Sequence, residues 1–495
     1  MAILTIVLNI IGLLVFIKYA WESFSPYYAA RRQFTIPGVT GQKYEVSEGM
    51  MFLLVVTITA PMFLPQISLL KYLVFYTIAL YYLLDRRYNC LMRGGPVVMI
   101  YLLFSVWLII ASIYSPHKFF AFRNLIKYSI PILALFVGYN ALKTKEDFVI
   151  LLKCLCYTGL FFSFWTGGFA ANFLHFITYS PFGWGVFSHY AAISDFFVVV
   201  IPAAIILGMM TGNKWWYLLA FWLTLSHVFY AVRTGLGGTF VSLAVLALYK
   251  YRFKSIPILV ALLFAAAAVI VYVPAVNEKF FNGEFEGEYT VEDIATGKVG
   301  LDNMQTNSRE YMWTRAMADL YDGHELTGSG LGSVAAGMEA HKYHPMLKLI
   351  HGDYVQLLCD TGLIGLWLFI AFVAAVALTI WIFGRRKNGE YTMYSGWLAA
   401  STLGGVLFCM GFDNVVSLSM IAMIFPFMFI GFFLKFKDLY AYADEAEFTA
   451  AIPDEEIEES EEIEDSDEFQ RERGDIVVVR QTEEDPIQRP MDFEP

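Results

Sequence analysis

Residues 361–383 read TGLIGLWLFIAFVAAVALTIWIF and are followed directly by Gly384, Arg385, Arg386 and Lys387. The stretch holds no charged side chain, and about 20 apolar residues suffice to cross the hydrocarbon core of a membrane as a helix. A helix is expected because an open sheet cannot satisfy its backbone hydrogen bonds in lipid. The stretch and its basic flank are therefore typical of a membrane span that ends at the cytoplasmic surface.

The rest of the chain has the same character. Of its 495 residues, 58% are hydrophobic and 16% are charged, whereas soluble domains are about 45–50% apolar and about 25% charged. This composition excludes a soluble enzyme, a disordered protein and a DNA-binding domain. It predicts an all-α polytopic membrane protein with about 12–13 transmembrane helices. The expected spans are 2–17, 50–65, 67–84, 97–114, 121–141, 148–168, 187–210, 215–231, 235–249, 256–274, 361–383, 393–412 and 415–434.

Lys and Arg gather in alternate loops, and the positive-inside rule assigns those loops to the cytoplasm. The N-terminus is then outside, and the first apolar run reads as an anchor because it lacks a basic start and a cleavage site. The same rule leaves one large loop outside. The predicted organisation is an N-terminal span and cytoplasmic loop, a transmembrane bundle, the large extracytoplasmic loop, the C-terminal transmembrane helices and an acidic tail. The N-terminal span and cytoplasmic loop are residues 1–49, and the transmembrane bundle is 50–274. The large extracytoplasmic loop is 275–352, the C-terminal helices are 353–443 and the acidic tail is 444–495.

The tail accounts for the negative net charge of the chain. Residues 444–495 hold 21 Asp and Glu against 4 Lys and Arg, so residues 1–443 carry a mildly basic excess. Apolar residues in the tail are not periodically spaced and are too few to form a core. The tail is therefore expected to be disordered and cytoplasmic. Binding of a partner by this tail is the alternative reading.

The cysteines and most histidines are predicted to have no chemical role. The cysteines lie within or beside apolar stretches, which is typical of small buried apolar residues. They are Cys90, Cys154, Cys156, Cys359 and Cys409. The spacing His341-x2-His344 has no cysteine partner and no H-E-x-x-H motif, so no metal and no cofactor is expected.

The segment NSREYMWTRAMADLY, 307–321, predicts a helix with Arg309 centred on its apolar face and Arg315 on its polar face. A cation on a buried stripe needs an anion, which is either a carboxylate of the protein or a phosphate of a ligand. Asn307 or Ser308 can cap the start of this helix. The sequence alone leaves the structural ion pair and the binding site equally open.

Two further motifs follow in the same loop. LTGSGLGS, 326–333, is either a tight turn, which is the favoured reading, or an anion-binding nest of backbone amides. HGDYVQLLCDTGLIGLWLF, 351–369, places His351 before an apolar helix, where the positive end of the helix dipole favours a neutral ring that can act as a general base. A capping or interfacial histidine is the alternative. Gly362 and Gly365 are expected to allow a bend or close packing.

Two charges lie in or beside other spans. Arg233, in YAVRTGLGG, is expected at the outer membrane boundary, where a charge is either a functional residue or an interfacial anchor. Asp195, six residues after His189, is expected to pair with an Arg or Lys.

These motifs in their order carry a resemblance. The sequence has xRTGxxGT at Arg233, R-x-x-x-W at Arg309, L-x-G-x-G-x-G from 326 and H-x-D-Y-x-Q-L-L-x-x-x-G-x-x-G from His351. In this order, within a many-span bundle with one large outer loop, they resemble the O-antigen ligase and O-antigen polymerase superfamily over residues 50–434. The chain departs from that pattern at Gly352, where the family often has Asn, in an extra N-terminal span and in an acidic lobe near 278–292.

The resemblance implies a membrane glycosyltransferase, similar to C-type glycosyltransferases, that uses a lipid-linked donor and neither nucleotide nor metal. The donor is a glycan on undecaprenyl diphosphate, and the acceptor is a sugar hydroxyl of a growing chain or of the lipid A core. The expected location is the bacterial inner membrane, with the site facing the periplasm. Arg233, Arg309 and His351 correspond to the functional residues of the family. The residues expected to bind substrate are Arg123, Lys118, Trp313, Asp353, Tyr354 and Gly330.

The alternatives stay open at this point. A polymerase is favoured over a ligase on the long tail and on Gly352. A glycolipid transporter would predict an internal repeat and charges deep in several spans, which the sequence lacks. A receptor that signals through its tail is a third reading. Other polysaccharide-assembly proteins, such as a flippase or a chain-length regulator, are further partners that the resemblance allows, whereas nucleic acid is excluded.

Overall fold

The computed structural model describes residues 95–141, 145–166, 190–230, 232–273, 309–345, 347–385, 388–418 and 420–450, together with residues 18, 55, 73 and 75–77. These residues form helices and connecting turns, with no strand among them. In chain order the helices are α5 (Gly95–Tyr114), α6 (Lys118–Ala141), α7 (Lys145–Thr166), α9 (Tyr190–Thr211), α10 (Trp215–Tyr230), α11 (Arg233–Tyr251), the 3₁₀ helix η4 (Arg252–Ser255), α12 (Ile256–Tyr272), α15 (Arg309–Leu320), α16 (Ser333–Glu339), α17 (Asp353–Phe383), α18 (Glu390–Phe412), α19 (Val415–Leu418) and α20 (Met420–Ala450).

Several of these helices are long and apolar enough to cross a membrane. Within the described residues, six stretches meet that requirement: Gly95–Tyr114, Lys118–Asn140, Ile193–Thr211, Arg233–Tyr272, Asp353–Phe383 and Glu390–Phe412. The chain is an all-α polytopic membrane protein, as the composition predicts. The total of about 12–13 spans stays a prediction, since the expected spans 2–17, 50–65 and 67–84 lie largely outside the described residues.

The stretch from Arg233 to Tyr272 is a hairpin of two helices. Arg252, with φ of 57°, and η4 reverse the chain between α11 and α12. Leu236, in the first turn of α11, packs against Val269 near the end of α12. The two helices are therefore antiparallel, in agreement with the two separate spans expected from the sequence.

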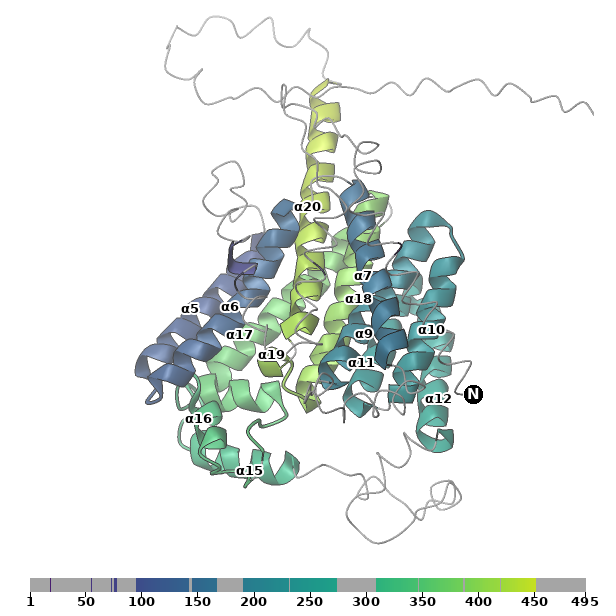
Figure 1. The fold of residues 1–495 in the computed structure, drawn as a ribbon. Helices are drawn as coiled ribbons and strands as arrows, with labels where there is room; N and C mark the ends of the chain where they lie inside the picture. Colours follow the sequence, from purple (N-terminus) through teal and green to yellow (C-terminus); the bar gives the residue numbers. More distant parts are fainter. Residues whose placement is uncertain are drawn as a thin grey trace, which may run out of the picture.

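The two ends of the bundle differ in chemistry. Helices α15 and α16 and the start of α17 lie at one end, and the C-terminal end of α20 lies at the other (Figure 1). The helix ends and turns on the α20 side carry basic residues of the predicted cytoplasmic loops, namely Lys214, Lys250, Arg252, Lys254 and Arg385. Lys435 and Lys437 lie within α20. The bundle thus separates the part of the large loop that the structure describes from the basic loops. That the large loop faces the outside stays a prediction of the positive-inside rule.

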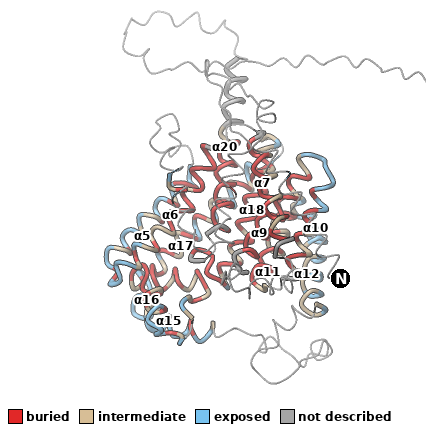
Figure 2. The backbone as a smooth tube through the Cα atoms, viewed as in Figure 1, coloured by how far each residue is buried: buried red, intermediate tan, exposed pale blue. Residues whose placement is uncertain are grey.

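Helix α20 runs through the middle of the bundle and packs on α6 and α18. Because lipid is as apolar as a leucine side chain, helices in a membrane associate through close packing and through small residues at the contacts. A Cβ at Gly138 would lie 2.2 Å from the carbonyl oxygen of Met428, and one at Gly431 would lie 2.2 Å from that of Leu135. These glycines let the backbones of α6 and α20 pack directly against each other. Figure 2 shows that the buried residues lie along the inside of the bundle.

The structure shifts some predicted boundaries. The span expected at 361–383 begins earlier, at Asp353, and bends at Gly362, which has φ of 67°. The span expected at 415–434 lies in α19 and the first half of α20. Helix α20 continues to Ala450, past the expected start of the tail at 444, because this part of the tail is rich in Ala and Glu, which favour helices.

The described part of the large loop folds as a lobe over the start of α17. Its core is a small cluster that is separate from the core of the bundle and consists of Met312, Ala316, Val334, Met338, Tyr343, Ile350 and Cys359. Asp319 of α15 binds the Tyr343 hydroxyl at 2.7 Å and also binds Lys342. These two hydrogen bonds lower the pKa of Asp319. The lobe therefore holds α15, and with it Arg309, in a fixed orientation against the bundle.

Candidate active site

Helix α15 presents its two arginines as the sequence predicts. Met312 and Ala316 are fully buried, and Arg309 on the same face is half-buried. Arg315 is exposed, and its guanidinium lies over the ring of Tyr311 at 4.8 Å. The apolar-face assignment of Arg309 is confirmed, whereas the caps proposed at 307–308 lie outside the described residues. Arg309 therefore directs a cation toward the bundle, and its Nε is buried without a hydrogen-bond partner.

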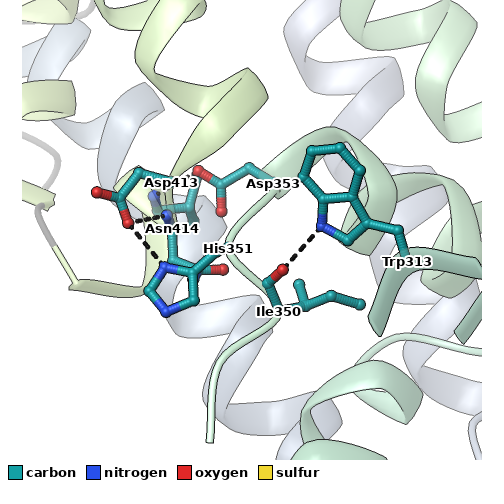
Figure 3. Close-up of polar contacts among 7 residues, drawn as sticks. Trp313, Ile350, His351, Asp353, Asp413 and Asn414 are labelled. Carbon is teal, nitrogen blue, oxygen red and sulfur yellow. Dashed lines mark hydrogen bonds and ion pairs between the residues drawn. The ribbon is translucent and has the colours of Figure 1, made fainter. Parts of the chain in front are cut away.

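His351 lies in the turn that leads into α17. Its φ is 51°, a left-handed conformation uncommon for a residue with a side chain, and Gly352 caps the helix in extended backbone. The indole N–H of Trp313 donates to the carbonyl of Ile350 at 2.8 Å (Figure 3). A Cβ at residue 352 would lie 3.1 Å from the same indole ring. Trp313 thus lies against the backbone on both sides of His351, and a side chain at position 352 would contact its ring tightly.

The imidazole of His351 faces a carboxylate that the sequence analysis did not single out. Its Nδ1 lies 3.3 Å from Oδ1 of Asp413, and the same oxygen accepts the backbone N–H of Asn414 at 2.8 Å (Figure 3). The side chains of His351 and Asp413 are 26% and 10% exposed. A carboxylate at Nδ1 fixes the ring orientation and holds the proton on that nitrogen. The Nε2 atom is then the one that can accept a proton from a substrate.

Two arginines complete this cluster. The positive charge of Arg233, the first residue of α11, is close enough to that of Arg309 to repel it, and Arg309 is attracted to Asp413. Burial lowers the pKa of Arg309, and the negative charge of Asp413 opposes this shift. The structure therefore brings Arg233, Arg309 and His351, which lie far apart in the sequence, to one end of the bundle with Asp413. An anion bound between the two guanidinium groups would relieve their mutual repulsion.

Asp353 lies behind this cluster. It is fully buried at the start of α17, and its Oδ2 accepts the backbone N–H of Val416 at 3.0 Å. The carboxylate therefore ties the start of α17 to α19, close to the turn that carries Asp413 and Asn414. Figure 3 shows the side chain of Asp353 beside this turn. The Oδ1 atom of Asp353 is buried without a hydrogen-bond partner among the described residues, and the binding of substrate by Asp353 stays a prediction.

The other residues expected to bind substrate contact the protein itself. The Tyr354 hydroxyl donates to the carbonyl of Leu407 at 2.8 Å. Lys118 donates to the carbonyl of Ile113 at the end of α5, and the guanidinium of Arg123 lies 5.1 Å from the ring centre of a neighbouring phenylalanine. No contact of these three residues with Arg233, Arg309 or His351 is seen in the described part of the chain. Their binding of substrate stays a prediction.

The glycine-rich loop is a turn whose amides already hold an anion. The backbone N–H groups of Gly332 and Val334 each donate to Asp360 at 2.9 Å, one to each carboxylate oxygen. Gly330 has φ of 98°, and a Cβ there would lie 2.5 Å from the backbone of Ser115. Only glycine fits this approach to the α5–α6 turn. Gly330 and its neighbours thus fasten the lobe to α5 and α17.

The sequence analysis did not single out Asp413, and it did not predict that Asp360 binds the glycine-rich loop. Asp413 directly follows an expected span, and a charge at a membrane boundary is itself a signal of function. Asp360 lies inside an apolar run, where an acid needs hydrogen-bond donors, but the sequence does not show that the donors come from the glycine-rich loop.

The histidines considered for a metal lie elsewhere in the lobe. His341 is exposed, and Nδ1 of His344 accepts the backbone N–H of Leu347 at 2.9 Å. No group of three or more His, Cys, Asp or Glu residues suited to a metal ion occurs within the described ranges. The four cysteines with described surroundings, at 154, 156, 359 and 409, are buried free thiols, as predicted.

A comparison with protein families matches this region. Residues 218–370 match the family described as O-antigen ligase. The matched segment holds Arg233, Arg309 and His351, whereas Asp413 lies beyond it. No curated protein sequence matches the chain. The match supports the O-antigen ligase and polymerase superfamily, to which the motifs of the chain are similar.

Proposed function

We propose that the protein is a surface-polysaccharide polymerase of the inner membrane. It transfers a glycan from an undecaprenyl-diphosphate-linked donor to the hydroxyl of an acceptor sugar at the outer face. The observation that carries this proposal is the convergence of Arg233, Arg309 and the His351–Asp413 pair at one end of an apolar bundle. The family match supports glycan transfer in surface-polysaccharide assembly.

The arginines fit the donor. Cleavage of the glycosyl–phosphate bond leaves its electron pair on a phosphate oxygen, so negative charge grows on the leaving diphosphate. Guanidinium groups bind such oxygens in a bidentate manner, and they act strongly where water is largely excluded. A diphosphate bound between Arg233 and Arg309 would offset the repulsion between their guanidinium groups. The charge of the leaving group is met in this way by side chains, and EDTA is expected to leave transfer unchanged.

The His351–Asp413 pair fits the acceptor. The acceptor hydroxyl is a weak nucleophile, and Nε2 of His351 takes its proton as the oxygen attacks the anomeric carbon. The carbon–oxygen bond to the acceptor forms while the bond to the diphosphate breaks. The imidazolium that results is stabilised by the carboxylate of Asp413, which also keeps the ring in place.

The carboxylates near the site favour a single displacement. A double displacement needs a free carboxylate that forms a covalent glycosyl intermediate. Asp413 contacts His351, and Asp353 and Asp360 are fully buried and bound to backbone amides. A single displacement inverts the anomeric centre, so we propose that the product has the opposite anomeric configuration to the donor.

A ligase that transfers the finished glycan to the lipid A core is the second candidate, because the family match carries the ligase name. Both candidates share the donor and the site, and they differ in the acceptor. The surface glycans of a deletion strain separate them. Loss of chain length with single repeats retained supports the polymerase, whereas accumulation of long lipid-linked chains contradicts it and supports the ligase.

A further inference from the structure

A buried histidine outside the proposed catalytic cluster joins three helices. His227 of α10 is fully buried, and both of its ring nitrogens bind hydroxyl groups. Its Nε2 lies 2.5 Å from Oγ of Ser194 on α9, and its Nδ1 lies 2.9 Å from Oγ1 of Thr239 on α11. Its ring also meets Phe197 edge-on at 5.5 Å between centres. The three polar side chains therefore satisfy one another at the contact of α9, α10 and α11.

This arrangement is specific because of where it lies. A polar group without a hydrogen-bond partner is strongly unfavourable in the apolar interior of a membrane protein. One ring nitrogen of neutral imidazole donates and the other accepts, and each hydroxyl can do either. Both contacts of His227 are thus satisfied only while the three helices keep their relative positions.

The first turns of α11, which begin at Arg233, lie directly against this contact. A Cβ at Gly235 would lie 1.9 Å from Oγ of Ser194 and 2.8 Å from Nε2 of His227. On the opposite side, the thiol of Cys409 donates to the carbonyl of Thr234 at 3.5 Å. The backbone that follows Arg233 is therefore enclosed by α9, α10 and α18.

We propose that His227, with Ser194 and Thr239, is a positioning residue that sets where Arg233 meets the donor diphosphate. This inference rests on the proposed function, since it takes Arg233 to be a diphosphate ligand. Arg233 is two residues from the glycine that touches the histidine, so a shift of α11 moves its guanidinium. A displacement of about 1 Å can cost about 10²-fold in rate. The Thr and Gly residues of the RTGLGGT motif then serve to place its arginine.

The test measures binding of undecaprenyl diphosphate to the purified full-length protein in nanodiscs. The variants are Thr239→Val, which loses the hydroxyl at constant volume, Thr239→Ser, which keeps it, and His227→Phe. Thr158→Val is the matched control because Thr158 is buried on α7 but donates only to Cys154 of its own helix. Thr239→Val and His227→Phe should weaken binding about 10-fold or more, and Thr239→Ser and Thr158→Val should bind within about twofold of wild type.

Double variants with Arg233→Ala separate positioning from general loss of structure. If His227, Ser194 and Thr239 act by positioning Arg233, then His227→Phe weakens binding in the wild-type protein and has no further effect in Arg233→Ala. An equal further loss in the Arg233→Ala background would overturn the inference, as would normal binding by Thr239→Val and His227→Phe. Normal binding by Arg233→Ala itself would instead refute the proposed function, so the two failures are distinguishable.

Discussion

The contact between His351 and Asp413 gives a residue-scale prediction. Asp413→Asn keeps the size of the side chain but can turn its amide N–H₂ toward Nδ1, which disturbs the tautomer and the ring orientation. Transfer should fall by about 10²-fold, at the lower end of what a general base supplies, while donor binding is largely kept. Initial rates of glycan transfer by purified protein measure the effect.

The matched control is Asp438→Asn. Asp438 accepts a hydrogen bond from Tyr139 at 2.7 Å at the opposite end of the bundle. Its replacement should leave transfer unchanged. An Asp413→Asn variant as active as Asp438→Asn would show that the carboxylate does not support His351.

The two arginines of α15 give a second residue-scale prediction. Arg309→Ala should abolish transfer and weaken donor binding, and Arg309→Lys should also be poor because a point charge does not replace a bidentate guanidinium. Arg315→Ala is the matched control on the exposed face of the same helix, and it should keep most activity. Binding of undecaprenyl diphosphate and the transfer rate measure both. Similar activity of the two alanine variants, in folded protein, would contradict the role of Arg309.

Whether the sequence predicts the place of a site residue depends on how far apart in the chain the interacting residues are. Arg309 and Arg315 could be told apart because both lie on one helix, whose period separates its faces. The pairing of His351 with Asp413 could not be predicted, since Asp413 follows the next span and only the packing of α17 against α18 brings the two together. The occupation of the glycine-rich amides by Asp360 depends on tertiary contacts in the same way.

At the scale of elements, Asp360 is predicted to hold the glycine-rich loop and α16 in place. Asp360→Ala leaves two buried backbone N–H groups without an acceptor, at a cost of about 1–3 kcal/mol each. Hydrogen exchange of residues 328–339 should become faster. Asp322→Ala, at an exposed position in the same lobe, should leave it unchanged. Unchanged protection in Asp360→Ala would show that the loop is held by other contacts.

Apolar length and period predict the helices of the bundle, but they do not predict the contacts that join helices distant in sequence. The bond between Asp353 and the amide of Val416, at the start of α19, joins residues that are distant in sequence, and apolar length does not reveal it. The start of α17 at Asp353 agrees with the helix expected directly after His351, whereas apolar length alone places the start of the span at 361. The bend at Gly362 was readable, since glycine in a span allows such a conformation.

At the scale of the whole molecule, the basic residues and the lobe lie at opposite ends of the bundle, which predicts the topology. Lys348→Cys, in the lobe, should react with a membrane-impermeant maleimide in spheroplasts, in which the outer membrane is permeable and the inner membrane is intact. Lys254→Cys, in the turn between α11 and α12, should react only after lysis. Both side chains are exposed, which makes them suitable probes. The reverse labelling pattern would refute the assignment of the lobe to the outer face.

The most direct test of the proposed function is one assay with purified His351→Ala in nanodiscs. It records donor binding and glycan transfer from an undecaprenyl-diphosphate-linked donor to an acceptor glycan in the same sample. Because a general base supplies about 10²–10⁴-fold in rate, transfer should be about 1% of wild type or less. Donor binding should be retained, since the arginines are intact. Near-normal transfer by His351→Ala would contradict the central claim that this histidine activates the acceptor hydroxyl.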